Sequence, residues 1–248
     1  MSDILVVTAT AFEQNDIKGQ LSETVEQVVS TRAWCTGFFA GSTVRLVETG
    51  IGAVNTTQAL TCVLEFQRPQ LVLQLGVGGA YVGAGLAIGD LAMASAEVYG
   101  DIGVRTVEGW KPATTIGIPL LSQGTDYFNH FPVDSEIVDR AEKILRTGAR
   151  RITTGPFVTV QECSGTATLG AERRDRFEAI CENMEGAPAA HVSRLYGVPF
   201  LELRGISNLV EDRRTEDWDL PLAAANAQEA GMELLSGWPD ILADRELL

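Results

Sequence analysis

Short apolar segments that alternate with amphipathic segments constrain the fold of this chain more than any other feature. Residues 71–75 are almost continuously apolar, which is typical of a strand buried on both faces. Further strands are expected at residues 4–8, 44–48, 91–98, 157–160 and 200–203. Amphipathic or helical patterns occupy residues 13–21, 58–66, 135–146, 185–196 and 222–235, and residues 100–126 look irregular. The alternation predicts an α/β fold, a single-domain three-layer sandwich over residues 1–248 whose central mixed β-sheet is flanked by helices.

The charge of the chain argues against a nucleic-acid partner. The formal net charge is −14, from 19 Lys and Arg against 33 Asp and Glu, so no basic stripe is available for a phosphate backbone. The densest basic cluster, at Arg173, Arg174 and Arg176, lies among acidic residues. We interpret it as the solvated face of a helix.

The cysteines and histidines indicate a reduced environment without a metal site. Cysteines at positions 35, 62, 163 and 181 show no Cys-x-x-Cys spacing, and the chain has only two histidines. Cys163 is expected to be a small buried hydrophobic residue rather than a nucleophile. The apolar segment at residues 4–7 is too short for a signal peptide, and no segment approaches the length of a membrane span. We therefore expect a soluble, cytoplasmic protein with no membrane partner.

Five predicted strand ends carry residues suited to ligand binding, because ligands of open α/β sheets bind at the carboxyl ends of the strands. These ends are residues 8–13, residues 50–52, the glycine-rich turn at 76–81, residues 183–186 and residues 204–210. Taken singly, each has a simpler structural explanation. Glu13 and Glu185 could be carboxylates in the first turn of a helix, and Ser207 and Asn208 could form an ordinary loop.

Taken in order, these segments resemble the nucleoside phosphorylase and nucleosidase superfamily over nearly the whole chain. The matching motifs are Ala9-x-x-x-Glu13, Thr49-Gly-Ile-Gly52, Gly76 to Tyr81, Ile88-Gly-Asp90, Gly155-Pro-Phe-Val158, Asn183-Met-Glu-Gly186 and Arg204-Gly-Ile-Ser-Asn208. The Met-Glu pair and the Arg-x-Ile-Ser-Asn motif at this separation are the specific part. The resemblance implies a nucleoside phosphorylase-like fold, a small nucleoside substrate, no metal or organic cofactor, and a homo-oligomer, either a dimer or a dimer of dimers.

The resemblance also implies roles for individual residues. Glu13 would activate the attacking water, Glu185 would bind the ribose hydroxyls with Met184 packed on the sugar, and Asn208 would contact the N7 edge of the purine. The remaining residues implied in substrate binding are Val77, Gly78, Gln161, Cys163, Ser164, Asn183, Ser207 and Trp218. Residues 161–164 match the base-binding strand end of the family, and Trp218 matches a flap near the 5′ end of the nucleoside or is a core residue at a helix start.

Hydrolysis is expected rather than phosphorolysis. Phosphorolytic relatives hold phosphate with arginine, whose bidentate charge-assisted hydrogen bonds suit an oxyanion. The positions that match their Arg and Ser are Gln74 and Val77, neither of which can fulfil that role. The implied reaction is dissociative, with an oxocarbenium-like sugar attacked by water that Glu13 deprotonates.

Asn208 favours a 6-oxopurine base. The adenine-specific relatives carry Asp at this position, whereas an amide offers two donor hydrogens to N7 and O6. Residues 183–187, 196–200 and 203–210 are similar to the futalosine hydrolases, which implies cleavage of futalosine to hypoxanthine and dehypoxanthinyl futalosine in menaquinone biosynthesis. Three alternatives stay open: a nucleosidase for inosine or for methylthioadenosine and S-adenosylhomocysteine, a purine nucleoside phosphorylase, and a non-catalytic nucleoside-binding protein.

Overall fold

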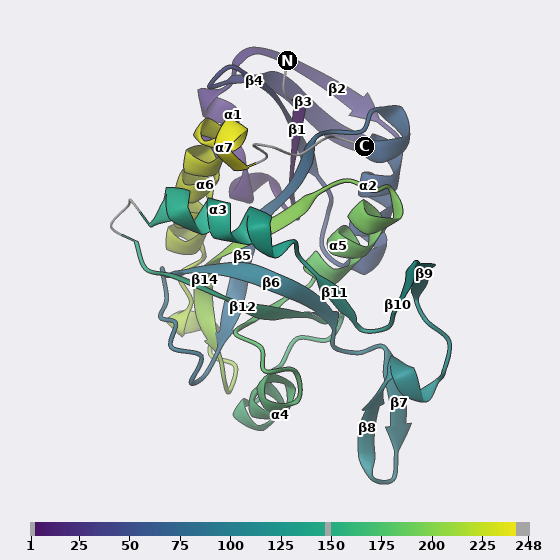
Figure 1. Cartoon of the computed structure of the whole chain (residues 1–248). Helices are drawn as coiled ribbons and strands as arrows, with labels where there is room; N and C mark the ends of the chain where they lie inside the picture. Colours follow the sequence, from purple (N-terminus) through teal and green to yellow (C-terminus); the bar gives the residue numbers. More distant parts are fainter. Residues whose placement is uncertain (1–2, 147–149, 242–248) are drawn as a thin grey trace.

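A mixed β-sheet forms the centre of the molecule in the computed structural model, which describes residues 3–146 and 150–241 (Figure 1). In these residues the sheet has ten strands in the order β11-β6-β12-β13-β5-β1-β4-β3-β2, and β14 pairs with both β5 and β6. Their bounds are β1 (Asp3–Thr8), β2 (Ser22–Val29), β3 (Arg32–Phe39), β4 (Ser42–Glu48), β5 (Leu71–Tyr81), β6 (Leu91–Tyr99), β11 (His130–Pro132), β12 (Ile152–Thr159), β13 (Cys181–Asn183) and β14 (Phe200–Val210). The double pairing of β14 closes β5, β14, β6, β12 and β13 into a ring.

Helices cover both faces of the sheet, as predicted (Figure 1). One group consists of α1 (Asn15–Gln20), α3 (Ser135–Leu145), α6 (Leu220–Ser236) and α7 (Trp238–Ile241), with α6 packed on β5 and β14. The other group is α2 (Ala53–Phe66) and α5 (Gly186–Leu195), while α4 (Ala167–Phe177) contacts β5 and β12. None of the described helices is long and apolar enough to cross a membrane. The expected domain over residues 1–248 also includes segments outside the described residues.

The central strands are buried because apolar side chains on both of their faces meet helices. Residues 4–7 of β1 are completely inaccessible to solvent, and β5 begins with four buried apolar residues among its first five. Strands of this kind give the continuous apolar pattern that the sequence showed. The local sequence also explains where α3 begins. Asp134 caps the helix by accepting a hydrogen bond from the backbone N–H of Glu136 at 2.9 Å.

The predicted glycine-rich turn at residues 76–81 is wrong, because β5 continues as a strand through Tyr81. β14 likewise continues to Val210 instead of ending at residue 203, and the two strands pair in parallel along their length. The glycines are needed for close approach of side chains to the strand backbone. A Cβ on Gly76 would lie 2.6 Å from Glu13 Oε1 and 2.8 Å from Arg204 Nη1.

The region expected to be irregular contains short paired strands. β7 (Gly103–Thr106) pairs with β8 (Gly109–Pro112), and β9 (Leu121–Gln123) pairs with β10 (Thr125–Tyr127), with a 3₁₀ turn η2 (Ala113–Thr115) between the two pairs. Strands of three or four residues are too short to show an alternating pattern. The expected amphipathic segment at residues 13–21 is split into η1 (Ala11–Glu13) and α1, and η3 (Thr215–Asp217) precedes α6.

Candidate active site

A cavity of about 360 Å³ lies where the five predicted strand ends meet. Residues that follow β1, the second halves of β5 and β14, strand β13 and the start of α5 all contribute to its wall. Every predicted site residue except Gln161 lines it. The structure therefore brings together segments that are up to two hundred residues apart in the chain.

Glu13 is held rigidly at one side of this cavity. It lies in η1, directly after β1, and is only 3% exposed. Its Oε1 accepts a hydrogen bond from the backbone N–H of Val77 at 2.9 Å. Its Oε2 accepts from the backbone N–H of Thr10 at 2.9 Å and from the Thr10 hydroxyl at 2.7 Å, which forms a capping box. Three donors thus fix the carboxylate of Glu13 in one orientation.

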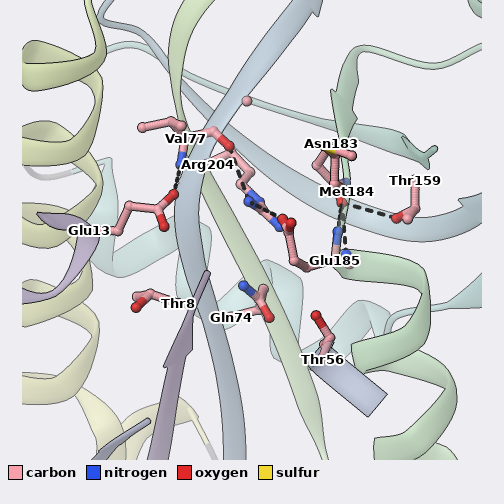
Figure 2. Close-up of polar contacts among 12 residues, drawn as sticks. Thr8, Glu13, Thr56, Gln74, Val77, Thr159, Asn183, Met184, Glu185 and Arg204 are labelled. Atoms are coloured by element: carbon pink, nitrogen blue, oxygen red, sulfur yellow. Dashed lines mark hydrogen bonds and ion pairs between the residues drawn. The ribbon is translucent and has the colours of Figure 1, made fainter. Parts of the chain in front are cut away.

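Glu185 lies on the other side of Arg204, at the N-cap of α5 (Figure 2). Its Oε1 accepts from the backbone N–H of Gly52 at 3.0 Å, and its Oε2 lies 3.3 Å from Arg204 Nη1. Asn183 fixes the helix start, because its Oδ1 accepts from the backbone N–H groups of Glu185 and Gly186 at 3.0 and 2.8 Å. The Asn183 side chain is therefore a support for Glu185.

Arg204 lies between the two carboxylates, and no role was predicted for it from the sequence (Figure 2). It is 1% exposed, and its Nη1 donates to the carbonyl of Val77 at 3.1 Å as well as to Glu185, while Nε donates to Glu202 at 2.8 Å. Burial lowers the pKa of its guanidinium, but the charges of Glu202, Glu185 and Glu13 together outweigh burial and raise the pKa above its ordinary value. We name Arg204 with these three glutamates the Arg204 cluster.

A signal for Arg204 was present in the sequence. Glu202 and Arg204 interrupt the apolar strand β14 two residues apart, where ionisable side chains must share a buried face. Ionisable residues are almost never fully buried unless they are paired. A charged pair inside a buried strand therefore marks a place where the fold needs the charges.

A further carboxyl, that of Glu97 on β6, lies next to the Arg204 cluster but outside it, and it is completely buried. It accepts hydrogen bonds from Asn183 Nδ2 at 2.6 Å and from the Thr159 hydroxyl at 2.7 Å. Burial, and then the neighbouring charge of Glu202, raise the pKa of the Glu97 carboxyl well above its ordinary value. The pKa of Glu202 is also raised, first by burial. The two carboxyls therefore titrate as a pair in which the protonated form of Glu97 is favoured.

A second buried arginine pairs with Glu182, a carboxylate of the cavity wall. Arg173 was interpreted as part of a solvated helix face, and this is wrong: its side chain is 7% exposed and lies 3.3 Å from Glu182 Oε2. Glu182 also accepts hydrogen bonds from the Ser164 N–H at 2.8 Å, the Ser164 hydroxyl at 2.6 Å and the Tyr81 hydroxyl at 3.0 Å. Arg173 points inward because a buried carboxylate needs a charged partner. We name these four residues the Arg173 cluster.

Asn208 faces the cavity near this second cluster. Its Oδ1 accepts from the Ser207 hydroxyl at 2.8 Å, and its Nδ2 donates to the carbonyl of Leu209 at 3.0 Å. The Ser207 hydroxyl also lies 3.2 Å from the carbonyl of Gly78. The amide group therefore has one donor hydrogen left for a ligand, where the sequence analysis counted two.

Residues 161–164 differ from one another in their placement. Gln161 lies outside the cavity, and its Oε1 accepts from the backbone N–H of Ala53 at 3.0 Å. Cys163 is exposed in the cavity, 3.5 Å from the sulfur of Met184, so its predicted burial is wrong. The chain leaves β12 here and turns toward α4, which exposes the Cys163 side chain and buries that of Ser164.

The two positions used to argue against phosphate are not equivalent. Gln74 is completely buried in β5 below the cavity and does not line it (Figure 2). Val77 does line the cavity, so it alone supports the argument. At the mouth of the cavity, the guanidinium of Arg213 stacks on the ring of Trp218, 4.4 Å from its centroid.

No group of three or more His, Cys, Asp or Glu side chains in the described part of the chain is placed to bind a metal ion. The cavity instead combines carboxylates with the amides of Asn183 and Asn208, and its described lining residues include two cations, Arg204 and Arg213. Such a site can orient a water molecule, hold hydroxyl groups and place hydrogen-bonding groups around a planar base.

Residues 3–236 match the family described as the phosphorylase superfamily. The chain belongs to the phosphorylase superfamily.

Two curated relatives are hydrolytic members of this family. A 5′-methylthioadenosine/S-adenosylhomocysteine nucleosidase from Actinobacillus succinogenes is 28% identical over 93% of this chain and 97% of its own length. A futalosine hydrolase from Thermus thermophilus is 32% identical over 77% of this chain and 80% of its own length. The chain is accordingly a nucleosidase.

Solved structures share the fold. The S-adenosylhomocysteine nucleosidase from Streptococcus pyogenes, in complex with 5-methylthiotubericidin, superposes with a TM-score of 0.84 at 22% identity, covering 96% of this chain and 98% of that one. The 5′-methylthioadenosine/S-adenosylhomocysteine nucleosidase from Neisseria meningitidis, in complex with methylthio-immucillin-A, also has a TM-score of 0.84 at 22% identity, with 96% and 100% covered. At this identity the likeness establishes the fold alone.

Proposed function

We propose that this enzyme hydrolyses futalosine, a hypoxanthine nucleoside, to hypoxanthine and dehypoxanthinyl futalosine. The observation that carries the hydrolytic part is the Arg204 cluster. Glu13 and Glu185 face one cavity with Arg204 between them, and the guanidinium is already paired with Glu185 and Glu202. The net negative charge of the cluster would repel a phosphate dianion, whereas it would not repel a neutral water molecule.

In the proposed mechanism the Arg204 cluster acts on the sugar and the nucleophile. Glu13, fixed by Val77 and Thr10, orients water and takes its proton as the N-glycosidic bond loosens. Glu185 accepts hydrogen bonds from the ribose hydroxyls, and its negative charge stabilises the positive charge that develops on the sugar. Asn208 donates to the departing base, because an amide can stabilise charge there by hydrogen bonding but cannot deliver a proton as an acid would.

Three observations support futalosine as the substrate. The Thermus thermophilus relative is named futalosine hydrolase, and Asn208 supplies an amide where adenine would favour a carboxyl. The third is Arg213, exposed at the cavity mouth and stacked on Trp218. Its guanidinium suits the benzoate carboxylate at the 5′ end of futalosine, since arginine pairs with carboxylates through two parallel hydrogen bonds.

A second candidate is a nucleosidase for methylthioadenosine and S-adenosylhomocysteine. Coverage favours it, because the Actinobacillus succinogenes relative of that name aligns with 93% of this chain, against 77% for the futalosine hydrolase. Its substrates have an adenine base and no benzoate. The two candidates therefore differ at both ends of the cavity, at Asn208 and at Arg213.

The deciding experiment incubates the enzyme with futalosine, aminofutalosine, inosine and methylthioadenosine, each with and without inorganic phosphate, and identifies the products. We expect free hypoxanthine and dehypoxanthinyl futalosine from futalosine, at a rate that phosphate does not change. A sugar 1-phosphate product would exclude hydrolysis. Faster cleavage of methylthioadenosine than of futalosine would favour the second candidate.

The proposal includes a cellular setting. Futalosine cleavage would place the enzyme in menaquinone biosynthesis, in the cytoplasm, and the resemblance to the family implies a dimer or a dimer of dimers. Light scattering after size-exclusion chromatography would measure the mass of the assembly. A mass of 26.7 kDa, that of one chain, would contradict the oligomer.

A further inference from the structure

Glu182 and Asn208 lie on opposite sides of Gly79 in one row across three strands. Gly79 of β5 is the register partner of Glu182 on β13 and also of Asn208 on β14. Neighbouring strands are about 4.8 Å apart, so the Cα atoms of Glu182 and Asn208 are separated by about 10 Å. All three residues line the cavity. The row therefore places a carboxylate-bearing and an amide-bearing residue of the cavity wall on either side of Gly79.

Gly79 allows the Asn208 side chain to lie close to β5. A Cβ at this position would lie 2.9 Å from Val210 Cγ2 and 3.1 Å from Asn208 Nδ2. Any side chain on Gly79 would displace Asn208 or Val210. The absent side chain thus fixes where the Asn208 amide lies relative to β5 and Glu182.

The Glu182 carboxylate changes what the cavity wall offers to a ligand. The backbone N–H of Ser164, at the expected base-binding strand end, donates to Glu182 Oε1 at 2.8 Å and is no longer free. Its Oε2 accepts hydrogen bonds from the Tyr81 and Ser164 hydroxyls and pairs with Arg173. Among the described residues, only the Ser164 N–H donates to Oε1. A carboxylate oxygen accepts two hydrogen bonds, so Oε1 can accept one more.

Position 1 of the purine ring separates the two candidate bases. In a 6-oxopurine N1 carries a hydrogen and donates, whereas in a 6-aminopurine N1 carries a lone pair and accepts. Both bases share the N7 acceptor, and Asn208 has a single donor hydrogen left, which N7 can occupy in either base. Selection of the base therefore requires a second polar group in the cavity.

We propose that Glu182 is this group: its Oε1 accepts the N1–H of a 6-oxopurine and repels the N1 lone pair of a 6-aminopurine. The inference rests on the proposed function, because it concerns the base of the same substrate. Arg173 supplies the charge that lets the carboxylate remain buried, and Tyr81 and Ser164 fix its orientation. Asn208 and Glu182 together then read two edges of the base, N7 and N1.

The first test needs no mutation and uses free bases as competitive inhibitors of the wild-type enzyme. Hypoxanthine has the N1–H, whereas 1-methylhypoxanthine keeps O6 and N7 but lacks it. We expect the methylated base to bind about 10- to 100-fold more weakly, the effect of losing a hydrogen bond to a charged group. Adenine should also bind more weakly than hypoxanthine. Equal binding of hypoxanthine and adenine, or no measurable binding of hypoxanthine, would overturn the proposal.

A pair of variants separates recognition from the effect of the added methyl group. In Glu182→Gln the three donors at the Oε2 position hold the amide oxygen there. The NH₂ group then takes the Oε1 position, where the backbone N–H of Ser164 loses its acceptor and a ligand finds none. We expect hypoxanthine to bind about 10- to 100-fold more weakly while adenine binds no worse, so the preference ratio shifts toward adenine. Tyr81→Phe is the matched control, since it removes one donor to Oε2 but leaves Oε1 as an acceptor, and its ratio should not change. Equal shifts in both variants would mean that Glu182 has a purely structural role.

The outcomes distinguish this inference from the proposed function. If hypoxanthine is preferred over 1-methylhypoxanthine and adenine but futalosine is not cleaved, the substrate assignment fails and the role of Glu182 stands. If futalosine is cleaved but the methylated base binds as well as hypoxanthine, the role of Glu182 fails and the substrate assignment stands. If Glu182→Gln does not fold, the inhibition of the wild-type enzyme still decides.

Discussion

Arg204 lines the cavity, whereas Arg173 pairs with Glu182 of the cavity wall; each arginine holds carboxylates in place, yet the balance of charge differs between them. Arg204 faces Glu13, Glu185 and Glu202, whereas the ion pair recorded for Arg173 is with Glu182 alone. The Arg204 cluster is therefore negative overall, and the Arg173 cluster is balanced. Under the proposed function, excess negative charge stabilises a cationic sugar, and a balanced pair offers an acceptor without attracting cations.

This difference teaches how one cavity separates reaction from selection. A group that stabilises developing charge must carry net charge that its neighbours do not cancel. A group that selects a base needs only a hydrogen-bonding direction, and its charge is best neutralised by a partner. Substitutions in the Arg204 cluster should therefore change the rate for every substrate, and substitutions of Glu182 or Asn208 should change the preference between bases.

The largest effect is expected for Glu13→Gln. The amide can still accept a hydrogen bond from the N–H of Val77 but cannot take a proton from water, so kcat should fall about 10²- to 10⁴-fold with little change in KM. Steady-state kinetics with futalosine measures both constants. Glu108→Gln, at an exposed residue outside the cavity, is the matched control. A near-normal kcat in Glu13→Gln would contradict the assignment of water activation.

Glu185→Gln should have the next largest effect and of a different kind. Its carboxylate is expected to hold the sugar before and during the reaction, so the substitution should raise KM and also lower kcat. Loss of charge-assisted hydrogen bonds to the ribose would reduce kcat/KM about 10²-fold. The substitution Glu185→Gln should lower the activity on a deoxyribose analogue of the substrate less than it lowers the activity on the ribose compound. A change in kcat alone would place Glu185 on the water and not on the sugar.

Asn208→Asp tests whether Asn208 sets the preference between 6-oxopurine and 6-aminopurine nucleosides. Asp offers an acceptor suited to the amine of adenine, and its ionised form repels O6, so kcat/KM for futalosine should fall about 10- to 100-fold. Activity on aminofutalosine should fall less or rise. The measurement is kcat/KM for both nucleosides in both proteins. An unchanged ratio would remove Asn208 from base recognition and leave the discrimination to the Arg173 cluster.

The smallest effect concerns stability, through Glu97. Because its folded pKa lies well above the ordinary value, the folded protein binds more protons than the unfolded chain above about pH 4.3, the ordinary pKa of Glu. This contribution to stability is complete below that pH and is lost as the pH rises toward the folded pKa. Glu97→Gln removes the titration, so its Tm relative to the wild type should increase between pH 5 and pH 8, as measured by calorimetry. A pH-independent difference in Tm would mean that Glu97 does not titrate in this range.

Much of the architecture and of the site could be predicted from the chain itself. Apolar segments located the central strands, since burial on both faces leaves no polar positions, and the resemblance to a known family placed Glu13, Glu185 and Asn208 in one site. The glycine-rich segment 76–81 was also predicted to lie at a ligand site, and Gly78 and Gly79 line the cavity. Its strand conformation was not predicted: without Cβ atoms its glycines give no side-chain pattern, so an extended strand and a turn look alike in the sequence.

Only the tertiary structure showed which charges are buried together. Arg173 sits among acidic neighbours in the chain and looked solvated, yet in space its partner is Glu182 on another strand. Glu202 and Arg204 are two residues apart in β14. Glu97, in contrast, lies near them only because β14 pairs with β6. The sequence determines the apolar periodicity because burial acts on each segment separately. The protonation and pairing of buried charges depend on groups from several strands at distances of a few ångströms, and that proximity exists only after the sheet has closed.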